Sequence, residues 1–218
     1  RLLDSATSSK VKDEFRQRMA ECAVYLHRKA IIEMIHLQDL EQAENDLLEA
    51  LEIFKLRYGD AQLKDRLEEG MQHLAVKVEG ACLHHLGMVR EHKRDLNEAI
   101  RLYRESLALT LPMSENEGYE LEYEMATRSS KTIHQLAGVY AQKGLYDDAV
   151  RCYEYSQEMK IRLVGWDHLS TANTLHFYGW AREMQGQYWD ALKAYEEALE
   201  ISQVIPYFLL SGYTTVSC

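Results

Sequence analysis

The stretch that decides the fold is LAGVYAQKGLYDDAVRCYEYSQEMK, residues 136–160. In its second half a small, a large, a small and an apolar residue follow one another at offsets of four, seven and ten: Ala149, Tyr153, Ser156 and Met159. These offsets lie along one face of an α-helix. Gly144 precedes this helix at the place where a helix commonly ends on a left-handed residue. The stretch therefore predicts two helices joined by a tight turn, a helical hairpin.

The same pattern occurs four times along the chain. The small residue that opens it is Ala43, Ala99, Ala149 and Ala191, and the large residue that follows is Leu47, Tyr103, Tyr153 and Tyr195. Upstream of each alanine lies a second amphipathic stretch. Its packing face carries a small residue in three copies, Gly87, Ala137 and Gly179, where the first copy has Ile31. Because one hairpin cannot bury its apolar faces alone, this repetition predicts an all-α fold, an α-solenoid of about four stacked hairpins.

The small–large–small pattern resembles the tetratricopeptide repeat. The last two copies are similar to the kinesin-light-chain subtype at Leu136-Ala137-Gly138-Val139-Tyr140, at Gly144-Leu145-Tyr146-Asp147-Asp148-Ala149 and at the connector Gly165-Trp166-Asp167-His168. The spacing from Ala149 to Ala191 matches that subtype, whereas the earlier copies are further apart. The resemblance covers roughly residues 20–204. It implies a right-handed solenoid with a concave groove that binds extended peptides or partner helices.

The two ends of the chain fall outside the repeats. Residues 1–9 are expected to be frayed, and a helical repeat domain is expected over residues 10–204. The repeats are predicted near residues 20–57, 80–112, 130–164 and 172–204. Pro206 is expected to end the last helix, because proline breaks helix interiors. Residues 205–218 would then be an apolar tail: a cap, the start of a missing repeat, or aberrant sequence.

Signals at helix ends agree with the hairpins. Gly144 and Gly186 follow the first helices of the last two copies, where a left-handed residue is favoured. Asp95 and Glu98 have the spacing of a capping box at the start of a second helix, with Asp in place of Ser or Thr.

Candidate groove residues follow from the repeat offsets, on the face of each first helix opposite its partner helix. They are Arg28 in the first copy, His84, Met88 and Glu91 in the second, Lys131 and His134 in the third, and Asn173, His176, Trp180 and Glu183 in the fourth. The three histidines occupy one repeat position. They form either a row that reads a peptide backbone, with pH sensitivity near the ordinary pKa of about 6.5, or a coincidence inherited by repeat duplication.

Other groove side chains suggest what a ligand would meet. Trp180 either anchors a peptide side chain or packs against the C-terminal tail or a missing repeat. The cations Arg28 and Lys131 could hold a carboxylate, whereas Glu91 and Glu183 would oppose a strongly acidic ligand. Two further residues are expected to form interhelix packing contacts or salt bridges, Arg90 and Arg182.

Composition excludes several classes of function. The chain has 218 residues and a formal net charge of −10, which disfavours nucleic acids and anionic membrane surfaces as partners. No apolar run approaches the roughly 18 residues of a membrane span. Its 4 cysteines are widely spaced and contain no CxxC pair, so they predict free thiols in the reducing cytoplasm rather than disulfides or a zinc site. Because the chain begins at Arg1 rather than methionine, we expect it to be a fragment.

Catalytic and cofactor motifs are absent from the sequence. It contains no P-loop, G-x-S-x-G, HExxH or G-x-G-x-x-G motif. One histidine per repeat cannot converge on one metal ion, because packed helices lie about 8–10 Å apart. The sequence therefore predicts a protein–protein interaction scaffold without enzyme activity, cofactor or metal. The alternatives are a structural segment, which serves as a spacer or self-associates through residues 205–218, and a regulatory arm of a larger enzyme or motor.

Overall fold

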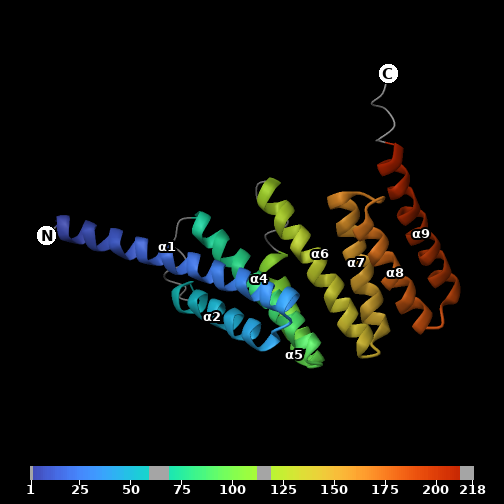
Figure 1. Cartoon of the computed structure of the whole chain (residues 1–218), viewed down its shortest axis with the longest axis horizontal. Coiled ribbons are helices and arrows are strands. Elements are labelled where there is room, and N and C mark those ends of the chain that lie inside the picture. The colour runs from blue at the N-terminus through green and yellow to red at the C-terminus, as the bar shows by residue number, and fades with distance from the viewer. Residues whose placement is uncertain (1, 59–68, 112–118, 212–218) are drawn as a thin grey trace, which may run out of the picture. The chain divides into compact units, whose positions relative to one another are not determined.

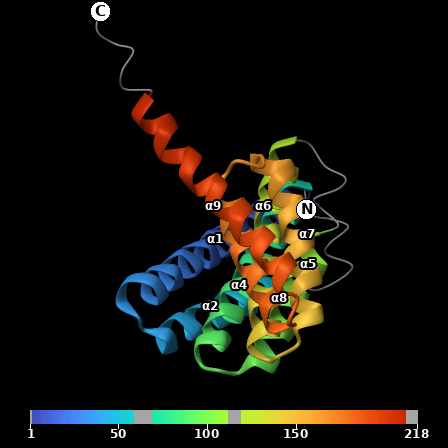
Figure 2. The same ribbon diagram turned by 90° about the vertical axis from the view of Figure 1, so that its right-hand side faces the viewer.

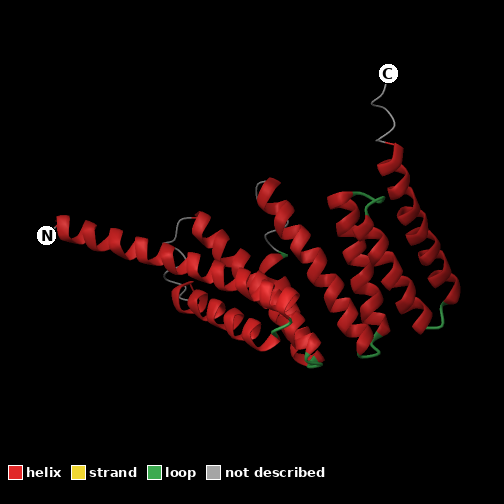
Figure 3. Cartoon of the chain, viewed as in Figure 1, coloured by secondary structure: helices red, strands yellow, loops and turns green. Residues whose placement is uncertain are grey.

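The computed structural model describes residues 2–58, 69–111 and 119–211. Helices make up nearly all of these residues, and the described part contains no strand (Figures 1 and 3). The first helices of the four hairpins are α1 (Leu2–Ile32), α4 (Glu69–His92), α6 (Tyr119–Gln142) and α8 (Leu169–Met184). The second helices are α2 (Leu40–Tyr58), α5 (Leu96–Thr110), α7 (Tyr146–Val164) and α9 (Tyr188–Ser211). The predicted all-α fold of four helical hairpins is confirmed.

The chain divides into two compact units, Arg1–Leu109 and Thr110–Cys218. In unit 1, α1 packs on α2, and α4 contacts both of these helices. In unit 2 each helix packs on the next, α6 on α7, α7 on α8 and α8 on α9. The last turns of α9 extend beyond the end of α8 (Figures 1 and 2). Nearest-neighbour packing of this kind is how repeat hairpins bury their apolar faces.

The turn inside every hairpin contains a left-handed residue. Gly144 and Gly186 have φ values of 76° and 77°, as their positions after the first helices predicted. The first two hairpins use Gln38, with a φ of 55°, and Arg94, with a φ of 63°. The sequence did not reveal these two, because side chains other than glycine rarely adopt a positive φ.

Small residues let the helices of a hairpin approach closely. A Cβ atom added at Gly87 would lie 2.5 Å from Cε1 of Tyr103, and one added at Gly179 would lie 3.0 Å from the ring of Tyr195. In these two repeats the large residue therefore occupies the space that the glycine leaves. This close approach confirms the packing role predicted for the small position.

Buried serines tie the second helix of a repeat to the first. Ser106 on α5 donates a hydrogen bond of 2.8 Å to the carbonyl oxygen of Gly80 on α4. Ser156 on α7 donates an equivalent bond of 2.8 Å to the carbonyl oxygen of Ser130 on α6. Both serines are fully buried. Serine at this small position therefore forms a hydrogen bond between the two helices, which the alanines of the other repeats cannot form.

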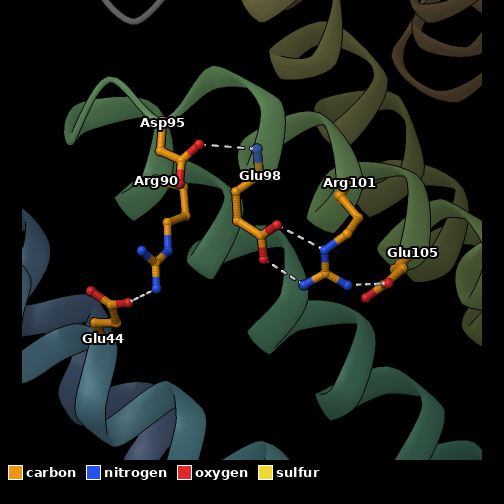
Figure 4. Close-up of polar contacts among 6 residues, drawn as sticks. All are labelled: Glu44, Arg90, Asp95, Glu98, Arg101 and Glu105. Atoms are coloured by element: carbon orange, nitrogen blue, oxygen red, sulfur yellow. Dashed lines mark hydrogen bonds and ion pairs between the residues drawn. The ribbon is translucent and has the colours of Figure 1, made fainter.

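The start of α5 contains half of the predicted capping box. Asp95 accepts a hydrogen bond from the backbone N–H of Glu98, at 3.3 Å (Figure 4). The reciprocal bond does not form, because the N–H of Asp95 donates to the carbonyl oxygen of Arg90. The carboxylate of Glu98 instead pairs with Arg101, which also pairs with Glu105. An exposed ion pair within α5 thus takes the place of the return bond.

The first and last helices extend further towards the ends of the chain than the sequence predicted. α9 passes through Pro206 to Ser211, so the prediction that this proline ends the last helix is wrong. Proline has a φ near the helical value and removes one helical hydrogen bond, so a helix can continue past it at a cost of about 3 kcal/mol. α1 begins at Leu2, inside the segment expected to be frayed. The end of the predicted tail, residues 212–218, lies outside the described residues.

Candidate functional site

The candidate residues on α4 are engaged in packing within unit 1. His84 is buried, and its ring centroid lies 5.7 Å from that of Tyr103. Glu91 accepts a hydrogen bond of 3.0 Å from the Tyr103 hydroxyl. Met88 is half-buried and packs against the hydrophobic core. These three groove positions therefore hold α4 against its neighbours and leave little side-chain surface for a ligand.

Arg28 is the candidate on α1, and its side chain is exposed. It lies at a surface hollow of about 500 Å³ between α1 and α4. The hollow is lined by Gln17, Ala20, Glu21, Val24, Tyr25, Arg28 and Leu74. Arg28 is thus exposed at this hollow, and its binding of a carboxylate stays a prediction.

His134 occupies the junction of α6, α7 and α8 in unit 2. Its ring lies edge-on to Tyr153 at 5.3 Å and to Phe177 at 5.4 Å between centroids. Burial, and secondly the charge of Lys160, lower the pKa of His134 to about 3. The ring is therefore neutral near pH 6.5, and the suggested pH sensitivity at that value is wrong for this histidine, because desolvation disfavours its charged form.

Lys160 on α7 lies beside this ring and was not among the predicted site residues. Its ammonium donates a hydrogen bond of 2.6 Å to Oγ1 of Thr174, which itself lies 3.4 Å from Nδ1 of His134. Burial, and secondly the charge of the exposed Lys131, lower the pKa of Lys160 to about 8. The sequence held a signal, since Lys160 continues the apolar face that runs through Tyr153.

The candidates on α8 differ in exposure. Asn173 and His176 are exposed, and the His176 ring lies 5.5 Å from Tyr195 between centroids. Trp180 is half-buried and lies edge-on to Tyr146 of α7 at 6.4 Å. Glu183 accepts a hydrogen bond of 2.8 Å from the Tyr195 hydroxyl. The α8 surface therefore presents Asn173 and His176 to solvent.

A second surface hollow lies next to Asn173. Its volume is about 560 Å³, and it is lined by His168, Leu169, Ser170, Ala172, Asn173 and Ser202. His168 caps α8, because its side chain accepts a hydrogen bond from the N–H of Ser170 at 3.1 Å. The hollow thus belongs to the N-terminal end of α8, where Asn173 forms part of its edge.

Two arginines at one repeat position form salt bridges between hairpins, as predicted. Arg182 on α8 pairs with Glu154 on α7, with 3.1 Å between nitrogen and oxygen. Arg90 on α4 pairs with Glu44 on α2 (Figure 4), which also pairs with Lys93. Glu44 is buried, and it was not recognised from the sequence. These contacts place both arginines in the packing of successive repeats.

The cysteines, the metal-ligating side chains and the helix lengths of the described residues complete the description. Cys22, Cys82 and Cys152 are free thiols, and Cys218 lies outside the described range. Within residues 2–58, 69–111 and 119–211 no group of His, Cys, Asp and Glu side chains is placed to hold a metal ion. No helix in these same ranges is long and apolar enough to span a membrane.

Two family models match the chain, and both describe the tetratricopeptide repeat. One matches residues 81–117 and the other residues 128–203, which together make up just over half of the sequence. No curated protein sequence matches the chain.

Solved structures with similar folds include BtubC (BKLC) from P. vanneervenii. It has a TM-score of 0.53 and 12% identity, and the match covers 86% of this chain and 74% of that chain. A putative kinesin light chain from Podosopora anserina has a TM-score of 0.49 and 15% identity, over 93% of this chain and 96% of that chain. MamA has a TM-score of 0.45 and 16% identity, over 78% of this chain and 96% of that chain. At 12% identity, the similarity to BtubC supports the fold of this chain and says nothing of its function.

Proposed function

Because the chain belongs to the tetratricopeptide repeat family, we propose that it binds a peptide or helix of a partner protein on the first helices of its hairpins. Tetratricopeptide repeats are typically non-catalytic interaction scaffolds, and the described residues contain no cluster of metal-ligating side chains. The partner is therefore a protein.

The observation that carries the proposal is a set of exposed polar side chains on neighbouring first helices of unit 2. Lys131 on α6 and Asn173 and His176 on α8 are exposed, and α6 contacts α8 directly. Buried side chains of the same helices hold these helices in place, among them Thr174 on α8, which is fully buried. Exposed donors and acceptors on packed helices suit recognition of a peptide backbone, because rigid elements hold them in place.

Among the groove residues, those that pack within the hairpin have structural roles, and those that are exposed can contact a ligand. We assign ligand contacts to Lys131, Asn173 and His176, with Trp180 at the rim. Glu183 serves the hairpin instead, since its carboxylate accepts the hydroxyl proton of Tyr195. His134 supports the surface as a neutral ring.

A displayed peptide library tests this proposal. Peptides selected on the intact chain would be measured against a double variant, Asn173→Ala with His176→Ala. If these side chains contact the ligand, the affinity should fall at least about tenfold, which corresponds to about 1.4 kcal/mol. Circular dichroism would establish that the variant is as helical as the wild type.

The matched control lies on the second helix of the same unit. Arg151 and Tyr155 on α7 are exposed, so the double variant Arg151→Ala with Tyr155→Ala should keep the affinity. Peptides that bind both double variants equally well, or a library that yields no binder, would contradict the proposal. Such a result would favour the structural alternative, in which the repeats act as a spacer.

A further inference from the structure

The outward face of α9 carries a row of exposed large side chains. Tyr188 is 69% exposed, Trp189 84%, Leu192 47% and Leu199 57%. The opposite face of α9 packs on α8 through small and aliphatic residues, namely Ala191, Ala194, Ala198 and Ile201, all of them buried. α9 therefore has apolar residues on both sides, which is not the pattern of a helix with one solvated face. We call the four exposed residues the α9 stripe.

The neighbouring repeat shows what such a face does. α7 packs on α8 with a side that includes Tyr146, the repeat equivalent of Tyr188 in the α9 stripe. Tyr146 lies against Trp180, and Tyr153 stacks on Phe177 with ring centroids 6.2 Å apart. Lys160, near the end of α7, bonds to Thr174, near the start of α8. As the residue number rises along α7, the number of the residue that it contacts on α8 falls. The two helices therefore pack antiparallel.

Two residues of the α9 stripe, Tyr188 and Leu192, occupy repeat positions that are apolar or aromatic on α7, whereas Trp189 and Leu199 stand at the positions of Asp147 and Gln157. Counted from the repeat alanine, Tyr146 corresponds to Tyr188, and Val150 corresponds to Leu192. Val150 is 4% exposed, whereas Leu192 is 47% exposed. The α9 stripe therefore leaves exposed a position that is buried in the preceding repeat, and it shares a second position, Tyr188, with the α7 surface that binds an antiparallel helix. No described helix of unit 2 covers it.

We propose that the α9 stripes of two copies of this chain pack against each other as an antiparallel, two-fold symmetric pair. A two-fold axis at the level of Ala194 would bring Trp189 of one copy against Leu199 of the other. The aromatic end of each stripe then meets the aliphatic end of its counterpart. A symmetric pair uses the same surface twice and closes, which is the commonest arrangement of oligomeric proteins.

Charge supports the choice of a second copy as the occupant. Lys193 and Glu196 are both exposed on α9. In the antiparallel pair Lys193 of one copy lies beside Glu196 of the other, and the symmetry forms this contact twice. Within its own helix Lys193 has only a long contact of 3.9 Å with Glu197. The pairing thus joins opposite charges at the edge of the apolar contact, where they set register.

The expected dimer is weak. One pair of helices buries less surface than the roughly 800 Å² per partner of standard stable interfaces. Dimerisation should therefore depend on protein concentration. It involves α9 and not the exposed residues of α6 and α8, so it is independent of the proposed peptide-binding function.

Sedimentation equilibrium of the full chain tests the inference. The mass should rise from that of one chain towards that of two as the concentration increases. The double variant Leu192→Glu with Leu199→Glu should stay monomeric. Leu48 on α2 is equally exposed, at 47%, so Leu48→Glu provides the matched control and should dimerise like the wild type.

Charge reversal tests the register. Lys193→Glu and Glu196→Lys should each weaken dimerisation, because each places like charges together twice. An equal mixture of the two variants should regain it, because both contacts then join opposite charges. A wild-type chain that is monomeric at every concentration would overturn the proposal, whether its own residues 212–218 or another protein covers the stripe. A dimer that survives the double leucine variant would overturn it equally.

Discussion

At the scale of single residues, a glycine and a tyrosine together set the distance between the helices of a hairpin. Tyr103 is fully buried, and its ring fills the space beside Gly87. Its hydroxyl then reaches Glu91 on the same first helix. In the third repeat Ala137 stands at the position of Gly87, and Gly138 follows it. A Cβ atom added at Gly138 would lie 3.6 Å from the Tyr153 hydroxyl, an ordinary contact distance. Glycines of similar appearance in the sequence therefore have different roles.

This difference predicts opposite effects of two alanine substitutions. Gly87→Ala should lower the free energy of unfolding by about 1–3 kcal/mol, because its Cβ atom would displace the Tyr103 ring. Gly138→Ala should be neutral or should raise it by up to about 1 kcal/mol, since alanine favours the helix and meets no obstacle. Urea denaturation of both variants measures these changes. Equal destabilisation by the two substitutions would contradict the packing role of Gly87.

At the scale of helices, α6, α7 and α8 meet around a neutral histidine. His134 of α6 contacts Tyr153 of α7 and Phe177 of α8, and its pKa is lowered to about 3 chiefly by burial. In the unfolded chain a histidine has its ordinary pKa of about 6.5. As the pH falls below that value, the unfolded state takes up the proton first, so stability decreases on acidification. The loss extends down to the folded-state pKa.

The substitution His134→Phe should remove this part of the pH dependence. Between about pH 7 and about pH 5, the wild type should lose about 1–2 kcal/mol more than the variant, because only its unfolded state gains a proton at this site. Urea denaturation at both pH values gives the two differences. Parallel losses in both proteins would show that the folded chain can protonate this ring. The test uses differences, so other titrating groups cancel.

At the scale of the whole molecule, the chain consists of two units in which each helix depends on its sequence neighbours. In unit 2, α7 packs on both α6 and α8, whereas α9 packs on α8. Helices covered on both sides open less readily than helices covered on one side. The repeat architecture thus makes stability vary along the chain, because each hairpin contributes only contacts with the next one.

Amide hydrogen exchange should detect this gradient. At protein concentrations low enough to keep the chain monomeric, amides in the middle of α7 should exchange more slowly than those in the middle of α9. Raising the concentration should slow exchange in α9 if the proposed dimer forms. Equal protection of the two helices at low concentration would contradict nearest-neighbour stabilisation of unit 2.

Periodicity and turn residues along the chain were sufficient to predict the hairpins. The offsets from Ala149 to Tyr153 and Ser156 describe contacts inside one helical face, and Gly144 marks the end of the preceding helix. The bridge formed by Arg182 was also predictable, because a charged residue stood where another repeat has the tyrosine Tyr140. All of these features depend on residues near in sequence or on the adjacent repeat.

Side-chain exposure at equivalent positions was decided by the tertiary structure. His84 is buried and His176 is exposed, although they share one repeat position. Leu192 is exposed where Val150 is buried, because α7 packs on both α6 and α8, whereas α9 packs on α8 alone among the described helices of unit 2. Burial also lowers the pKa of Lys160 to about 8. A repeat pattern specifies which face of a helix a residue occupies, whereas exposure and charge depend on what packs against that face.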